Sequence, residues 1–378
     1  MKFRIPLYTL ILFTFFIFAL HAQDEAKKNE KSDRHFFTMI HEIGATSVKN
    51  QARTGTCWDF ATQSFLESEL MRMGKGRYNL SEMFNVRYTY PLKAERYVRY
   101  HGKYQFGEGG QAHDVLTIFD KYGAVPNSVY PGLEPGDTLY DNTEMDAVLK
   151  AALKTIVNRN RISDHYEALV NAICDVYLGK VPKTFEYKGK EYTPKTFAES
   201  LGINTKDYVE ITSFTHHPFY SKFVLEVPDN WEQGEYYNVP LKDLIRIIDN
   251  AISNDYSVAW DGAVGKNNFY RKADYAVVPI EGDTSTTGAE KELDVTQQLR
   301  QKAFDDYATT DDHLMQITGV AKDQAGTTFY YTKNSWGTKD KKYGGYWYMS
   351  EPFVKLRTIA IMVNKNAIPK DLRDKLGI

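Results

Sequence analysis

The chain has 378 residues, of which 42% are hydrophobic and 25% charged, and its formal net charge is −2. This is enough apolar material for the core of one large domain or of two smaller ones. The nearly neutral balance excludes a strongly basic surface for nucleic acid and an acidic tail for a cationic partner.

Residues 1–22 have the pattern of a secretory signal peptide. Lys2 and Arg4 precede an apolar run, and cleavage is expected after Ala22. An uncleaved membrane anchor is the alternative, although the run is short for a membrane span. We therefore expect an exported protein, periplasmic or secreted, without stable membrane association after signal removal. Residues 23–34 are charged and lack apolar periodicity, which predicts a disordered tether.

The remaining chain divides into a helical part and a strand-rich part. Apolar residues recur at helical spacing over residues 57–73, 112–122, 143–157, 164–178 and 194–201. From residue 208 the pattern is typical of strands, interrupted by one helix at 240–252, in the segments YVEITSF, KFVLEVP, SVAWDGAV, HLMQITGVA, TTFYYTKNSW, GYWYMSE and TIAIMVNK. This order predicts an α+β fold with a cleft where the two parts meet.

Cys57 follows the polar stretch TSVKNQARTGT and begins the first predicted helix. Unpaired backbone N–H groups and the helix dipole favour a thiolate at such a position, so Cys57 is a candidate nucleophile. The alternative is a buried cysteine or a disulfide with Cys174, the second of the two cysteines. Cys174 lies among apolar residues at helical spacing, which favours a packed core thiol.

A thiol nucleophile needs a base and a group that orients the base. His313 begins one strand-like segment, and Asn334 ends the next. If these strands are antiparallel neighbours, the Asn334 amide oxygen can accept a hydrogen bond from the His313 ring and fix its tautomer. The alternatives are a core histidine with satisfied hydrogen bonds and a turn at Asn334-Ser335.

The developing oxyanion needs hydrogen-bond donors, and the substrate needs space beside the nucleophile. Gln51, six residues before Cys57, could donate together with the Cys57 backbone N–H. Gly109 and Gly110 would allow a substrate backbone to approach closely, although a glycine pair also occurs in ordinary loops.

These segments together resemble the papain superfamily of cysteine peptidases. The resemblance rests on TSVKNQARTGTCWDFA, NLSEMF, GEGGQAHDVLTIFDKYGAVPNSVYPG, DDHLMQITGVA and YYTKNSWGT. It implies a two-lobed papain-like fold, with a helical lobe and a β-barrel-like lobe, that acts on peptides. It also implies that Cys57 is the nucleophile, His313 the general base and acid, Asn334 the orienting residue, Gln51 the oxyanion donor, and Trp336 a shield over the His313–Asn334 bond. Trp336 is also expected to contact the substrate, together with Gly109 and Gly110.

The branch resembled is that of bleomycin hydrolase and aminopeptidase C. Cys57 and His313 are 256 residues apart, against roughly 130–150 in papain and the cathepsins. GKVPKTFEYKGKEYTPKTF and VAWDGAVGK are also similar to this branch. The resemblance implies a helical lobe at about 35–142, a mainly helical insertion at about 143–205 and a strand-rich lobe at about 206–378. It further implies an aminopeptidase and a hexameric homo-oligomer. An open-cleft endopeptidase and an inactive binding scaffold are the alternatives.

Three features depart from that branch. Asp59 places a carboxyl two residues after the nucleophile, where it would oppose thiolate formation. The export signal contrasts with the mostly cytoplasmic relatives. The family's C-terminal carboxylate lies in the cleft and meets the substrate amine, whereas it is open whether Ile378 reaches it. We expect no cofactor and no metal, because His216-His217-Pro218 and His41-Glu42 lack the spacing of a metal site.

Overall fold

The computed structural model describes residues 35–133, 136–159, 161–265, 268–280 and 289–378. The predicted signal peptide and the predicted tether lie outside these residues. Within the part that is described, no helix is long and apolar enough to cross a lipid bilayer.

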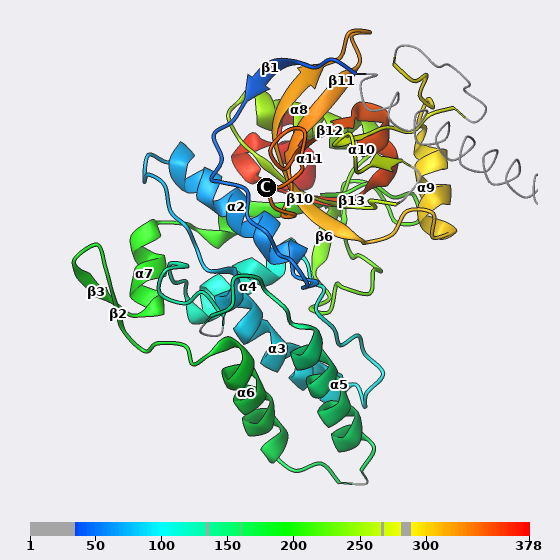
Figure 1. The fold of residues 1–378 in the computed structure, drawn as a ribbon. Coiled ribbons are helices and arrows are strands. Elements are labelled where there is room, and N and C mark those ends of the chain that lie inside the picture. The colour runs from blue at the N-terminus through cyan, green and yellow to red at the C-terminus, as the bar shows by residue number, and fades with distance from the viewer. Residues whose placement is uncertain (1–34, 134–135, 160, 266–267, 281–288) are drawn as a thin grey trace, which may run out of the picture.

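Helix α2 lies between the helical part and the sheet (Figure 1). The first three helices are α2 (Cys57–Arg72), α3 (Glu82–Arg99) and α4 (Ala112–Tyr122). Almost the whole length of α2 is buried, because one side packs on α3 and α4 and the other on the sheet. Residues of α2 share a hydrophobic cluster with Ala259, Leu314 and Met362 of the sheet. This packing fixes the N-terminus of α2 at the boundary between the two parts.

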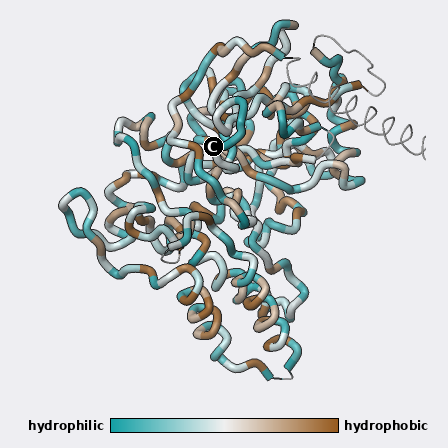
Figure 2. The backbone as a smooth tube through the Cα atoms, in the orientation of Figure 1, coloured by the Kyte–Doolittle hydropathy of each residue, from teal (hydrophilic) through white to brown (hydrophobic). Residues whose placement is uncertain are grey.

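The segment predicted as an insertion is mainly helical. It comprises α5 (Thr143–Val157), α6 (His165–Leu178), the hairpin β2 (Phe185–Tyr187) with β3 (Lys190–Tyr192), and α7 (Pro194–Leu201). Figure 1 shows α5 and α6 projecting side by side away from the sheet, and Figure 2 shows apolar stretches along both. Arg87 of α3 binds Asp175 of α6 at 2.7 Å. Cys174 is buried in this core, and both cysteines are free, so the disulfide alternative is wrong.

The strand-rich part is built on an 11-stranded sheet in the order β5-β6-β4-β13-β7-β10-β11-β12-β9-β8, with β1 paired to β10. Its strands are β1 (Thr38–Glu42), β4 (Tyr208–Thr212), β5 (Lys222–Val224), β6 (Glu235–Asn238), β7 (Val258–Gly262), β8 (Phe269–Tyr270), β9 (Tyr275–Ala276), β10 (His313–Lys322), β11 (Thr328–Lys333), β12 (Tyr346–Ser350) and β13 (Thr358–Asn364). The helices here are α8 (Leu241–Ser253), α9 (Gln297–Asp305), α10 (Glu351–Arg357) and α11 (Lys370–Leu376), with short 3₁₀ turns at Thr205–Asp207 and Lys365–Ala367.

All seven strand segments expected from the sequence contain strands, and the α4 and α5 bounds agree with prediction. The structure differs at β1, since residues assigned to the helical lobe pair with β10. Helix α3 is absent from the sequence-based expectations because charged residues and an internal Pro91 obscure its apolar periodicity.

Candidate active site

Cys57 is the first residue of α2 and is 9% exposed. The backbone N–H of Leu314 donates to its thiol, which places the sulfur beside the start of β10. The nucleophile candidate therefore lies next to His313, the residue before Leu314.

Burial is the main cause that raises the pKa of the Cys57 thiol to about 12. The carboxyls of Asp311, Asp261 and Asp229 also raise this pKa, whereas the hydrogen bond from Leu314 lowers it. The lowered pKa expected from the helix N-terminus is therefore not found, because burial and the neighbouring carboxyls raise the pKa more than the Leu314 hydrogen bond lowers it.

His313 is the first residue of β10 and is 3% exposed. Its Nε2 lies 2.7 Å from Asn334 Oδ1, and with the proton on Nε2 this nitrogen donates. The predicted antiparallel pairing of their strands is confirmed, since β10 pairs with β11 and Asn334 directly follows β11. Burial lowers the pKa of His313 to about 4, opposed by the bond to Asn334. A neutral imidazole held in this way can accept a proton.

Trp336 covers the imidazole. The two ring centroids are 4.7 Å apart, and the rings are tilted by 30°. The Arg271 guanidinium lies 4.8 Å from the Trp336 ring centroid. The structure thus places Trp336 against His313, where it can exclude water, while its contact with substrate stays a prediction.

Gln51 is buried in the loop before α2 and is tied to the segment that carries Asn334. Its backbone N–H donates to the Ser335 carbonyl at 2.9 Å, and the Ser335 hydroxyl donates to its side-chain oxygen. Its Nε2 donates to the Thr54 carbonyl at 2.8 Å. An amide nitrogen has two hydrogens, so one remains for an oxyanion.

Gly110 of the glycine pair lies against Trp58, the residue after Cys57. A side chain at Gly110 would come within 3.0 Å of the Trp58 ring. Trp58 Nε1 in turn donates to the Glu108 carbonyl at 3.0 Å, and the Glu108 carboxylate accepts from the Gly55 N–H at 2.7 Å. These bonds hold the loop that carries Gly109 and Gly110, here called the glycine loop, beside the start of α2. The two glycines therefore lie near Cys57.

Asp59 does not act on the thiol as the sequence suggests. It is fully buried and accepts from Asn85 Nδ2 at 2.8 Å. Burial, followed by Glu82, raises its pKa well above the usual range. This shift favours the neutral form of the Asp59 carboxyl, which opposes a thiolate less than a charged one would.

Sequence reasoning missed the three carboxyls that do act on Cys57. Asp261 lies on β7, Asp311 lies two residues before His313, and Asp229 lies in the loop between β5 and β6. The available signal was the aspartate in the otherwise apolar segment VAWDGAV. Its convergence with the other two depends on the sheet register and on a loop, which no local pattern reveals.

Two clusters among the described residues have the spacing of metal ligands: His216, His217 and Glu226, and His113, Asp114 and Glu232. His216 and His217 contact Glu226 at 3.1 and 2.8 Å, a pairing that the sequence spacing did not reveal. His41 contacts Asp255 at 2.9 Å.

The C-terminal segment packs on the strand-rich part. Arg246 of α8 binds Asp371 of α11 at 3.1 Å. The N–H of Ile378 donates to the Arg373 carbonyl at 3.1 Å, and its side chain packs against the core that contains α8. The carboxyls that raise the pKa of Cys57 most strongly are the side chains of Asp311, Asp261 and Asp229, rather than the carboxylate of the C-terminal segment.

Comparisons with known proteins agree with this architecture. A profile of the Peptidase C1-like family matches residues 89–377. Aminopeptidase G of Lactobacillus delbrueckii subsp. lactis is 26% identical over 400 residues, which cover 93% of this chain and 89% of the relative. Aminopeptidase C of Lactobacillus helveticus is 24% identical, with coverages of 88% and 82%. The crystal structure of PepW from Lactobacillus rhamnosis has a TM-score of 0.74 at 19% identity and covers 100% of this chain and 96% of that chain. The predicted papain-like α+β fold is therefore confirmed.

Proposed function

The chain belongs to the Peptidase C1-like family of papain-like cysteine peptidases, and from this premise we propose that it is an aminopeptidase that uses Cys57, His313 and Asn334. The observation that carries the proposal is the buried 2.7 Å bond between His313 and Asn334, beside the Cys57 thiol. A base with a fixed tautomer next to a thiol at a helix N-terminus is the arrangement that thiol acyl transfer requires.

The reaction begins with the proton on sulfur. His313 accepts this proton while the sulfur attacks the scissile carbonyl, and Asn334 stabilises the resulting imidazolium. The Cys57 N–H and the Gln51 amide donate to the oxyanion. His313 then protonates the departing amine, and it later activates the water that hydrolyses the thioester, which returns the proton to sulfur.

Restriction to the N-terminal residue is supported by the relatives that bear the names aminopeptidases G, W, E and C. Asp229 supports it as well, because its carboxyl fills the space beside Gly109 in the glycine loop. A substrate chain that extends past this point would meet a carboxylate, whereas a free amine would be attracted to it.

The test compares fluorogenic aminoacyl substrates with free and acetylated N-termini on residues 23–378, alongside Cys57→Ala. Cys174→Ala is the matched control, because it removes the other buried thiol far from the cleft. We expect cleavage of the free-amine substrates by the wild type and by Cys174→Ala, and none by Cys57→Ala. Equal cleavage of the acetylated substrates would indicate an endopeptidase. Activity that survives in Cys57→Ala would refute the assignment.

Export and assembly are separate parts of the proposal. The basic residues and apolar run of residues 1–22 support secretion with cleavage after Ala22, which N-terminal sequencing of the exported protein tests. The resemblance to the bleomycin hydrolase branch supports a hexamer, which the mass measured by light scattering tests.

A further inference from the structure

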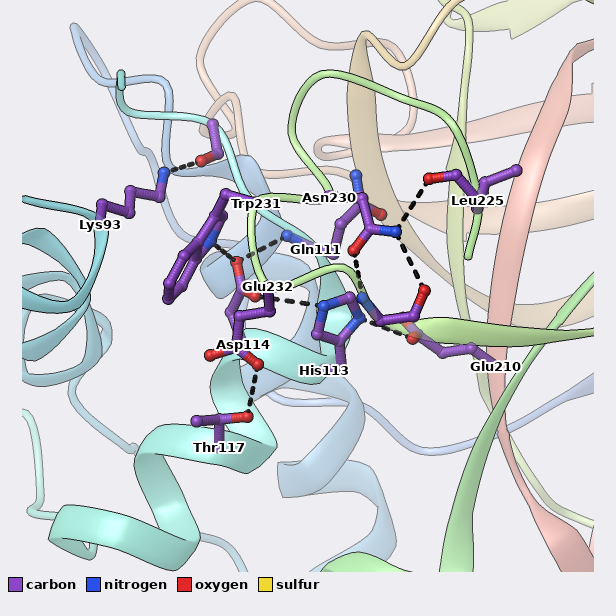
Figure 3. Close-up of polar contacts among 12 residues, drawn as sticks. Lys93, Gln111, His113, Asp114, Thr117, Glu210, Leu225, Asn230, Trp231 and Glu232 are labelled. Atoms are coloured by element: carbon purple, nitrogen blue, oxygen red, sulfur yellow. Dashed lines mark hydrogen bonds and ion pairs between the residues drawn. The ribbon is translucent and has the colours of Figure 1, made fainter. Parts of the chain in front are cut away.

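A cluster of one imidazole and three carboxyls lies at the start of α4, the helix that follows the glycine loop (Figure 3). His113 and Asp114 are in the first turn of α4, Glu210 is on β4, and Glu232 is in the loop between β5 and β6. One ligand atom from each of His113, Asp114 and Glu232 lies within 4.8 Å of the other two. The cluster therefore joins the helical part to the strand-rich part.

Two atoms of this cluster, His113 Nε2 and Asp114 Oδ1, are buried and have no hydrogen-bond partner among the described residues. The Asp114 side chain is 0% exposed. The two atoms are 3.4 Å apart, and Figure 3 shows them facing each other. Two ligand atoms on a tetrahedral zinc ion are about 3.3–3.4 Å apart when each metal–ligand distance is about 2.0–2.1 Å. The observed separation therefore fits two neighbouring ligands of one ion.

The far nitrogen of His113 is held by a carboxylate. His113 Nδ1 lies 2.7 Å from Glu210 Oε2. With the proton on Nδ1, this nitrogen donates to Glu210, and the lone pair of Nε2 is directed at Asp114. A carboxylate on the outer nitrogen of an imidazole is the usual support of a metal-binding histidine.

The two carboxyl ligands are supported in the same way. Trp231 Nε1 donates to Asp114 Oδ2 at 2.6 Å, and the Gln111 backbone N–H donates to the same oxygen at 3.0 Å. Asp114 Oδ1 is thus the oxygen that remains for a ligand. Thr117 Oγ1 donates to Glu232 Oε2 at 2.8 Å. All three side chains are therefore oriented before an ion arrives.

The second cluster with ligand spacing is arranged differently. Gln301 Nε2 donates to His216 Nδ1 at 3.0 Å, so a neutral His216 has its proton on Nε2, where it donates to Glu226 at 3.1 Å. The His216 and Glu226 side chains are 29% and 54% exposed. Because the nitrogen that faces Glu226 carries a proton and the group is solvated, this cluster is a surface hydrogen-bond network.

We propose that His113, Asp114 and Glu232 bind a divalent transition-metal ion of the zinc type, which ties α4 to the strand-rich part. One imidazole and two carboxylates suit such an ion, and water supplies the fourth position. Calcium and magnesium fit less well, because they prefer six or more oxygen ligands. The proposal is independent of the aminopeptidase function, because these residues take no part in the thiol reaction.

A proton is the competitor for His113 Nε2. Burial lowers the pKa of His113, but Glu210 and Asp114 raise it, to about 10 overall. An imidazolium paired with both carboxyls is therefore the alternative to a bound metal ion. The 3.4 Å separation of Nε2 and Asp114 Oδ1 is long for the hydrogen bond that an imidazolium would donate to a carboxylate.

The test is calorimetric titration of Zn²⁺ into residues 23–378 that carry Cys57→Ala, because the Cys57 thiol beside His313 is itself able to bind zinc. In this background we compare Glu232→Gln, His113→Gln and the matched control His216→Gln, which removes a histidine from the surface network. We expect one Zn²⁺ per chain in the background and in His216→Gln. Binding should be at least tenfold weaker in Glu232→Gln and in His113→Gln.

Thermal unfolding keeps the result independent of folding defects. Glu232 is half-buried, so Glu232→Gln should unfold in EDTA at the Tm of the background protein. Saturating Zn²⁺ should raise Tm in the background and in His216→Gln but not in Glu232→Gln. Absence of saturable Zn²⁺ binding would mean an ion-pair network only and would overturn the proposal. Background affinity in Glu232→Gln, or a loss confined to His216→Gln, would overturn it as well.

Discussion

Replacement of Asn334 by alanine removes the acceptor that holds the His313 imidazole, the proposed general base. Asn334 and His313 are each 3% exposed, so water cannot readily substitute for the lost oxygen. That oxygen accepts from His313 Nε2 and from the Ser335 N–H, each at 2.7 Å. A buried donor left without its partner costs about 1–3 kcal/mol. If the cost of the lost His313 hydrogen bond appears in the transition state, kcat decreases roughly 5- to 150-fold.

The assay is steady-state kinetics on a free-amine substrate. Thermal unfolding measures the stability lost when the Ser335 N–H loses its acceptor. Asn334→Asp is the control, because it keeps an acceptor oxygen and Asn334 Nδ2 has no partner among the described residues to lose. This variant should retain more activity than Asn334→Ala. Its carboxylate should also raise the pKa of His313 and move the acid limb of kcat/KM to higher pH. Wild-type kcat in Asn334→Ala would refute the reasoning.

Three further substitutions test the surroundings of the site. Asp59→Asn should raise Tm at pH 8 and not at pH 4, with kcat/KM unchanged. Because the pKa of Asp59 is raised in the folded state, folding at pH values above about 4 requires a proton that the unfolded chain has released. Asparagine removes this cost because it does not ionise. Lys93→Met strips the donor from the Gly107 and Gly109 carbonyls, so unfolding measurements should show a loss of about 1–3 kcal/mol, with a higher KM. Gly109→Ala puts a Cβ 1.9 Å from Asp229 Oδ2 and should impair cleavage of free-amine substrates, whereas Gly107→Ala, with its nearest neighbour at 3.7 Å, should not.

The sequence supported the central pair of residues because strand patterns carry local information. His313 and Asn334 lie at the ends of two successive apolar segments, and a short connection between them favours an antiparallel pair. The helix that starts at Cys57 was equally readable from its periodicity and from the polar loop before it.

The electrostatics of the site could not be read in this way. Whether Asp59 is charged depends on burial against α3, whose helical pattern is weak. The position of Asp261 beside the thiol depends on the register of β7 against β10. Strand alternation predicts which face a residue takes but not which partner lies opposite it. These tertiary contacts raise the pKa of Cys57, whereas its position at a helix N-terminus alone predicts a lowered pKa.

The most direct measurement is peptide mapping by mass spectrometry after brief treatment with leucyl chloromethyl ketone, a thiol-alkylating substrate mimic with a free amine. The account predicts a covalent adduct on Cys57 with none on Cys174, and much slower labelling by the N-acetylated reagent. Labelling of both cysteines alike, or of neither, would contradict the claim that Cys57 is the nucleophile of an amine-recognising peptidase.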